Sequence, residues 1–313
     1  MTEEWKYKGP IFDAHTHIGH SDDLVQMVKI EEEFNVASQV AIVHGEGNLK
    51  PIKKQFPNRF VFAKYLSLSD IANFEVDRVI AVIERIKPEG YGLAKMWFGP
   101  RWRDYYQEVP DDFRIDDLRL DPIFRALEDH GVPLLLHVAD PDTYYELHYQ
   151  DKKKYGTKAD SLVQLENVIE RHPRLVFQLP HFGSQPEIHH LSNLAKWLDR
   201  FPNIMLDTAS SRWMARELSK NVDMARRFLV KYSDRIMFGT DLSTNRGGQD
   251  YFTGRYLAQR LLWETNVRER PLPFDDADTK DTGGTFINGL DLPVSVLSKL
   301  YWENAVRFHG VPD

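Results

Sequence analysis

The feature that most constrains the fold is a regular alternation of short apolar runs with amphipathic stretches. Eight apolar runs occur, at residues 11–17, 36–44, 60–66, 91–98, 132–138, 175–181, 203–207 and 235–241. Several lack strict alternation, as Leu134, Leu135 and Leu136 show, and this is typical of parallel strands covered on both faces. Eight strand–helix units predict an α/β fold, a closed (β/α)8 TIM barrel; an open doubly wound sheet is the alternative.

The connections between the runs are uneven in length. Helices are expected at 24–34, 71–86, 122–130, 161–171, 187–200, 214–232 and 294–309, with a weaker one at 48–56. Long connections at 99–121, 139–160 and 242–292 all follow the carboxyl ends of strands, which in a barrel is the catalytic face. The last contains a helix near 251–263 and a polar part, 275–284, that reads equally as a lid or as a disordered surface loop. We expect residues 1–313 to form one barrel domain with long loops on this face.

Composition excludes several classes of protein. The chain is 42% hydrophobic and 28% charged, as in ordinary globular proteins, and its net charge of -7 argues against a nucleic-acid partner. It has no cysteine, so that any metal must be held by nitrogen and oxygen ligands. No apolar stretch of ~18 residues and no signal-like start are present, so we expect a cytoplasmic protein without a membrane partner.

Histidines and an aspartate follow several of the apolar runs. His15 and His17 are two residues apart on the first predicted strand, so their side chains point to the same side. His137, His181 and Asp241 end later strands in the same way. Each alone can be a structural polar residue with a partner, because burying such a group unpaired is costly. Together, at the carboxyl ends of barrel strands, they indicate a metal centre.

At this point the sequence resembles the amidohydrolase superfamily, in particular the amidohydrolase-related branch that includes aminocarboxymuconate semialdehyde decarboxylase. The matching pieces are Asp13-Ala14-His15-Thr16-His17, His137, His181-Phe182-Gly183, Gly239-Thr240-Asp241 and the terminal stretch 304–310. Their order and spacing span nearly the whole chain and are specific for the superfamily, but not for a substrate.

The resemblance implies a role for each matched residue. His15, His17, His137 and Asp241 would bind one divalent metal, with water or substrate in the remaining position. Zinc fits these ligands best, while manganese and other divalent ions remain open. Asp241 would accept a proton from the activated water and pass it to a leaving group, and His181 would lie beside the water or polarise the substrate.

Lys95, near the end of the fourth run, leaves the number of metals open. In binuclear members of the superfamily a carboxylated lysine on this strand bridges two metals. In the mononuclear branch a lysine here could instead bind a substrate carboxylate. We favour one metal, with Lys95 as a substrate-binding residue, and keep a second metal with carboxylated Lys95 as the alternative.

Arginines on the catalytic-face loops suggest an anionic substrate. Arg101 and Arg212 each lie a few residues after a strand end, and a guanidinium can clamp a carboxylate with two parallel hydrogen bonds. Loop packing or solvated charge explains either arginine equally well. His44, which ends the second run, is a further site candidate or part of a hydrogen-bond network at the rim.

Three functions are compatible with these residues. The first is a metal-dependent hydrolase that uses metal-activated water on a small, carboxylate-bearing amide, ester or lactone. The second is a lyase, a metal-dependent non-oxidative decarboxylase of a small unsaturated or aromatic acid. The third is a noncatalytic metal-binding barrel, against which the retention of all five site positions argues. A small-molecule substrate is the expected partner, and a homodimer is the oligomer that base rates favour.

Overall fold

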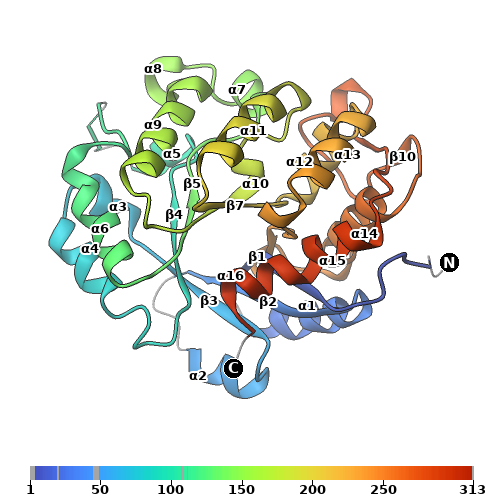
Figure 1. The fold of residues 1–313 in the computed structure, drawn as a ribbon, viewed down its shortest axis with the longest axis horizontal. Helices are drawn as coiled ribbons and strands as arrows, with labels where there is room; N and C mark the ends of the chain where they lie inside the picture. The colour runs from blue at the N-terminus through green and yellow to red at the C-terminus, as the bar shows by residue number, and fades with distance from the viewer. Residues whose placement is uncertain (1–3, 20, 45–48, 107–108, 111, 312–313) are drawn as a thin grey trace.

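The structure, a computed structural model, describes residues 4–19, 21–44, 49–106, 109–110 and 112–311. Its main sheet is parallel and has the order β8-β7-β6-β5-β4-β3-β2-β1-β9. The strands are β1 (Ile11–Ile18), β2 (Val36–Val43), β3 (Phe60–Tyr65), β4 (Leu93–Trp97), β5 (Leu134–His137), β6 (Phe177–Leu179), β7 (Ile204–Asp207), β8 (Ile236–Met237) and β9 (Leu242–Ser243). All eight predicted runs therefore contain strands, and the helices surround them (Figure 1).

The sheet closes on itself through the short segment between β8 and β9. These two strands are the outer members of the sheet order, yet only residues 238–241 separate them in the chain. The segment also bonds to β1: the Ala14 amide donates to the Phe238 carbonyl at 2.8 Å, and the Asp241 amide donates to the His15 carbonyl at 2.9 Å. The prediction of a closed (β/α)8 barrel is confirmed, and the open-sheet alternative is wrong.

One run, 235–241, was expected to be a single strand, but only Ile236–Met237 of it form one, and β9 begins just after the run at Leu242. Asp241 has a φ of 59°, in the left-handed region, immediately before β9. The backbone turns there, where the last run meets β1. Asp241 is therefore placed at the carboxyl end of the barrel by an irregular backbone rather than by a continuous strand.

Helices follow the strands in the expected order. The first half of the chain has α1 (Ser21–Glu33), α2 (Leu49–Gln55), α3 (Leu68–Ala72), α4 (Val76–Ile83), α5 (Trp102–Tyr105), α6 (Asp121–Asp129), α7 (Asp142–Leu147) and α8 (Lys152–Tyr155). The second half has α9 (Lys158–Arg171), α10 (Pro180–Gly183), α11 (Leu191–Arg200), α12 (Ser211–Leu218), α13 (Val222–Lys231), α14 (Gln249–Glu264), α15 (Val294–Ser298) and α16 (Asn304–His309). A two-stranded sheet joins β10 (Arg270–Pro271) to β11 (Phe286–Ile287) within the long connection after β9.

Two predicted helices were wrong in extent. The stretch 71–86 is divided into α3 and α4, because Phe74 between them has a φ of 56°, which ends a right-handed helix. The stretch 214–232 is divided into α12 and α13, because the Asn221 side chain accepts a hydrogen bond from the Met224 amide and starts a new helix there. The helix expected near 251–263 is present as α14.

The core has two layers, as a barrel requires. Inward-facing side chains of alternating strands, among them Phe12, Val40 and Leu135, fill the barrel interior. A larger apolar cluster lies between the outer faces of the strands and the helices. On the side opposite α6, the long helix α14 packs against both α12 and α1 (Figure 1). Among the described helices, none has the length and apolar character needed to cross a membrane.

Candidate metal centre

Two histidines of β1 and the aspartate before β9 converge at the carboxyl end of the barrel. One ligand atom from each of His15, His17 and Asp241 lies within 4.8 Å of the other two. The Asp241 Oδ1 atom is 3.3 Å from His17 Nε2 and 3.6 Å from His15 Nε2. The His15 side chain is 1% exposed, whereas those of His17 and Asp241 are 19% and 28% exposed, so the group is open on one side only.

A buried carboxylate that the sequence did not single out orients His15. Asp207, at the end of β7, accepts from His15 Nδ1 at 3.1 Å and from Gln178 Nε2 at 2.7 Å through its Oδ2 atom. Its Oδ1 atom accepts from the backbone amides of His181 and Ala209, at 3.2 and 3.0 Å. A proton on Nδ1, facing Asp207, would leave the Nε2 lone pair of His15 directed toward Asp241.

This arrangement fits a divalent cation. A lone pair on His15 Nε2 and a carboxylate oxygen 3.6 Å away repel each other unless a positive charge lies between them. Burial lowers the pKa of His17 to about 3, so its ring is neutral near pH 7, which is the form that binds metals. Burial by itself would raise the pKa of Asp241, but the hydrogen bond from His17 and the nearby His15 hold it well below its usual value. Two imidazoles and an ionised carboxylate suit zinc, manganese and related ions.

His181 and His137 lie beside these three residues but are not part of the converging group. The His181 ring lies 5.3 Å from the His15 ring and 4.6 Å from the His137 ring, measured between centroids. His137 is not among the three residues whose donor atoms converge, and its Nε2 lies 2.9 Å from Asp140 Oδ1. Its role as a ligand, through Nδ1, stays a prediction.

The backbone around His181 is unusual. His181 and Phe182 have φ values of 58° and 56°, and such conformations in residues with side chains cost energy that is commonly retained at functional sites. Burial lowers the pKa of His181 to about 3. Neither ring nitrogen has a hydrogen-bond partner among the described residues, and Nδ1 is fully buried. A neutral imidazole with unused hydrogen-bonding capacity is thus held beside His15.

Lys95 and His44 occupy the barrel mouth nearby. Lys95 is 2% exposed, and burial lowers the pKa of its amine to about 8, although Asp207 and Asp241 act in the opposite direction. His44 Nε2 is 2.8 Å from His17 Nδ1, so it belongs to the network that orients the second histidine of β1. His44 is therefore part of the hydrogen-bond network at the site.

The two arginines chosen from the sequence lie in different settings. The Arg101 side chain is 61% exposed and is 3.9 Å from Asp104, away from the donor group. Arg212, in α12, is 19% exposed; its Nη2 donates to the Tyr144 hydroxyl at 2.7 Å, and its Nε is 3.5 Å from Asp276. Its neighbour Trp213 packs against the His181 ring, with 4.8 Å between centroids. Arg212 is thus close to the centre, and Arg101 is on the rim.

The segment 275–284, interpreted from sequence as a lid or a disordered loop, is tied to α12. Asp276 and Asp278 both accept from Arg216 Nη1 at 3.1 Å, and Asp278 also lies 3.1 Å from His148. Thr285 adds a hydrogen bond to Asp276 at 2.7 Å. In this structure these contacts hold the segment against α12.

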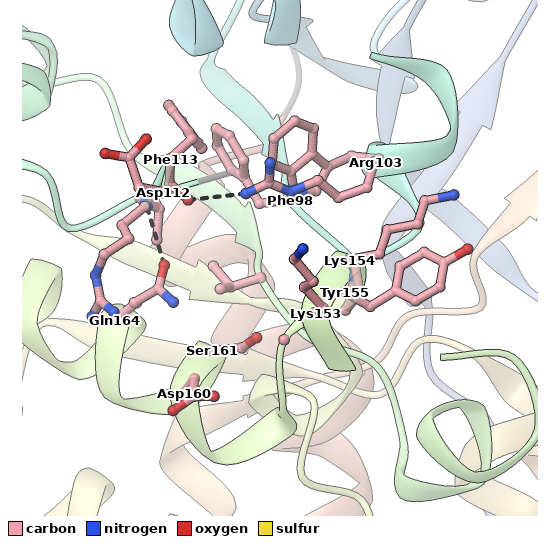
Figure 2. Close-up of a pocket in the computed structure, with 16 residues that line it drawn as sticks. Phe98, Arg103, Asp112, Phe113, Lys153, Lys154, Tyr155, Asp160, Ser161 and Gln164 are labelled. Atoms are coloured by element: carbon pink, nitrogen blue, oxygen red, sulfur yellow. Dashed lines mark hydrogen bonds between the residues drawn. The ribbon is translucent and has the colours of Figure 1, made fainter. Parts of the chain in front are cut away.

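A second histidine–carboxylate group and a nearby cavity are less suited to binding a metal ion or to bringing a substrate to the converging residues. A second histidine–carboxylate group, Asp142 with His189 and His190, contains the Lys158 ammonium 2.7 Å from Asp142, so the carboxylate is already neutralised. A cavity of about 370 Å³ lies beside the loops after β4 and β5 (Figure 2). Phe98, Arg103 and Lys153 line it, but none of the converging donors does.

The fold and the site define the class: a (β/α)8 barrel in which two histidines and an aspartate that could hold a metal ion converge at the carboxyl ends of the strands. A family model described as amidohydrolase matches residues 83–311, most of the chain. The chain therefore belongs to the amidohydrolase family and is a metal-dependent enzyme with amidohydrolase-like or decarboxylase activity. No curated protein sequence matches it.

Solved structures agree with this fold. A Staphylococcus aureus protein provisionally assigned as an amidohydrolase has a TM-score of 0.60 at 15% identity, over 96% of this chain and 99% of that one. The 5-carboxyvanillate decarboxylase of Sphingomonas paucimobilis has a TM-score of 0.57 at 13% identity, over 97% and 100%. The 5-carboxyvanillate decarboxylase of Novosphingobium aromaticivorans, complexed with manganese and 4-hydroxy-3-methoxy-5-nitrobenzoic acid, has a TM-score of 0.58 at 12% identity, over 99% of each chain.

Proposed function

We propose that the enzyme hydrolyses a small, carboxylate-bearing amide, ester or lactone with one divalent ion, zinc being the first choice. The observation that supports this most is the convergence of the His15 and His17 Nε2 atoms on Asp241 Oδ1 at the carboxyl end of the barrel. When bound there, the ion supplies Lewis acidity to a carbonyl and lowers the pKa of a water molecule. His137 is proposed as the further protein ligand.

The protein side chains then handle protons and orientation. Asp241 is the most exposed of the three converging residues, so water reaches its carboxylate; it accepts the proton of the attacking water and later delivers it to the leaving group. His181, which has an unused ring N–H, donates a hydrogen bond to the substrate carbonyl oxygen as negative charge develops there. Asp207 keeps His15 in the tautomer that leaves Nε2 free.

Lys95 is proposed as a substrate-binding residue, with Arg212 and, less directly, Arg101. With its pKa lowered to about 8, the Lys95 amine is still mostly protonated at neutral pH, the form that pairs with a substrate carboxylate. The neutral fraction, which grows above that pH, suits the alternative role, because only the neutral amine reacts with carbon dioxide to form a carboxylated lysine. Metal stoichiometry distinguishes the two roles: one ion per chain supports substrate binding, and two ions, reduced to one in Lys95→Ala, support the carboxylated form.

Hydrolysis is tested with a panel of small esters, lactones and amides, each with and without a carboxylate, in water enriched in heavy oxygen. We expect turnover that depends on added zinc and incorporation of solvent oxygen into the product. Asp241→Asn should lose this turnover, whereas Asp223→Asn, which removes an exposed carboxylate from α13, should retain it. Turnover that persists after complete removal of metal would contradict the proposal.

Decarboxylation is the second candidate, because two of the similar structures are 5-carboxyvanillate decarboxylases, one with manganese. In that reaction Lys95 or an arginine would orient the carboxylic acid substrate. A protonated side chain of the active site would then protonate the carbon that loses carbon dioxide. Carbon dioxide release from 5-carboxyvanillate, measured with the zinc-loaded and manganese-loaded enzyme, would favour it over hydrolysis. A protein that holds no stoichiometric metal and turns over neither panel would instead be a noncatalytic barrel.

A further inference from the structure

A cavity of about 510 Å³ adjoins the metal centre between α12, α14 and the segment 273–275. Three arginines are among its lining residues, Arg212, Arg246 and Arg255. We propose that this cavity binds the carboxylate of an aromatic or cyclic substrate, with Arg255 as the residue that determines specificity for an acid. This inference deepens the proposed function and rests on it, because it assigns the substrate class of the same site.

Arg255 is a buried cation without a counter-charge. It is 6% exposed, and its Nη1 donates only to neutral oxygens, to Ser210 Oγ at 3.2 Å and to the Thr240 carbonyl at 3.3 Å. Its Nε is buried with no partner, and within the described parts of the chain no carboxylate pairs with it. Burial of an unpaired charge is costly, so an anion that enters the cavity gains more from Arg255 than from an exposed arginine.

The other buried arginines of this part of the barrel show the contrast. Arg216 lies 2.9 Å from Glu217 and 3.1 Å from Asp276, and Arg260 pairs with Glu264 at 2.5 Å. Their positive charges are neutralised within the fold. Two of the basic groups around the cavity of Figure 2 are also paired: Lys154 with Asp104, and Arg114 with Asp116 at 2.9 Å. Arg255 therefore differs from its neighbours in that its charge is left for a ligand.

The position of the cavity fits a substrate that reaches the metal centre. Arg255 bonds to the carbonyl of Thr240, the residue immediately before Asp241. On the other wall, Arg212 is followed by Trp213, whose ring contacts that of His181. A carboxylate on Arg255 would thus lie beside the backbone that carries Asp241.

Aromatic walls and the remaining charges refine the ligand class. The Arg255 guanidinium lies 4.8 Å from the Tyr251 ring centroid and 5.5 Å from that of Phe274, and both residues line the cavity. Flat apolar walls beside a cation favour a planar acid. Asp250 and Asp275 also line the cavity, but both are exposed. The buried charged side chain of the cavity is therefore Arg255, whereas its exposed rim carries both acidic and basic side chains.

Calorimetric titration with benzoate and with the uncharged isostere benzamide tests this assignment. We expect the zinc-loaded wild-type protein to bind benzoate about tenfold or more tightly than benzamide, because only benzoate pairs with the guanidinium. Arg255→Met should lose this preference, and Arg255→Lys should keep only part of it, because the fork that binds two carboxylate oxygens is gone. Arg125→Met, which removes an exposed arginine from α6, should titrate like the wild type.

Further measurements separate this assignment from a purely structural role and from the proposed hydrolysis. Circular dichroism and zinc content are recorded for each variant; should Arg255→Met not fold, Arg255→Lys decides the question. Repeating the titrations on metal-free protein should preserve the dependence on Arg255. The proposal is overturned if Arg255→Met or Arg255→Lys retains the full preference, or if wild-type protein shows none. It is also overturned if the preference disappears with the metal, which would place the carboxylate on the ion. Failure of the hydrolysis assay with an intact benzoate preference would instead refute the reaction alone.

Discussion

Replacement of Asp207 by asparagine tests how the barrel prepares His15 for metal. Asp207 accepts four hydrogen bonds, two on each carboxylate oxygen. An asparagine side chain has one oxygen, which accepts, and one NH2 group, which donates. In Asp207→Asn the oxygen can therefore accept from only one of the two pairs of donors, and the NH2 group faces the other pair, which loses its acceptor. The two possible orientations of the amide are not equivalent in this structure.

The less costly orientation keeps the oxygen toward the backbone amides of His181 and Ala209. Gln178 Nε2 then loses one acceptor but retains the Ala14 carbonyl at 2.9 Å. His15 is then the residue that is destabilised, because its Nδ1–H loses the Asp207 carboxylate as a hydrogen-bond partner. One unsatisfied buried donor costs about 1–3 kcal/mol of folding free energy, so the metal-free protein should still fold. His15 can avoid this cost by moving its proton to Nε2, the nitrogen needed for metal. We therefore expect zinc affinity to fall by about 10- to 100-fold, or about 1.4–2.7 kcal/mol.

Chelator competition gives the zinc affinity, and urea unfolding of the metal-free protein gives the stability. Asp223→Asn serves as the matched control, because it removes a carboxylate that is exposed on α13. The reasoning would be refuted by an Asp207→Asn variant whose zinc affinity lies within about twofold of wild type, since then the orientation of His15 does not matter to the site.

Further predictions concern the converging residues and a histidine remote from them. His15→Ala and His17→Ala should each lower bound metal and activity together, by tenfold or more in metal affinity; normal metal content by elemental analysis in both would exclude them as ligands. Asp241→Asn should reduce kcat by about 10²- to 10⁴-fold with a smaller change in KM, and steady-state kinetics showing unchanged kcat would remove its role in proton transfer. Burial lowers the pKa of His309 to about 3, so the unfolded chain takes up a proton there between pH 6.5 and 3 while the folded chain does not. The unfolding free energy should thus fall as the pH is lowered through this range, and His309→Gln should remove about 2 kcal/mol of the loss between pH 7 and pH 5; equal slopes in urea titrations would contradict this.

The sequence predicted the barrel well because its strands are short, apolar and regularly spaced. It could not predict where helices 71–86 and 214–232 break, because the breaks depend on single residues, a left-handed Phe74 and a capping Asn221. It also treated residues 235–241 as one strand, although β8 ends at Met237 and the left-handed Asp241 precedes a separate strand, β9.

The candidate site was predicted in part. Position at strand ends was sufficient to bring His15, His17 and Asp241 together, because the topology of a barrel makes those ends meet. Asp207 carries the same signal at the end of β7, and attention to every polar strand end would have found it. Arg255 carries no such signal: it lies within a helix of an inserted segment, and only tertiary packing shows that its charge is unpaired.

The closure of the barrel ties the timing of folding to the acquisition of activity. The hydrogen bond between the Asp241 amide and the His15 carbonyl joins the first strand to the last segment of the barrel, a pairing of very large separation in the sequence. Contacts of this kind are slow to form because much of the chain must be ordered first. His15 and Asp241 come together only across this closure, because they lie on its two sides. Metal binding therefore reports completion of the ring rather than collapse of the chain.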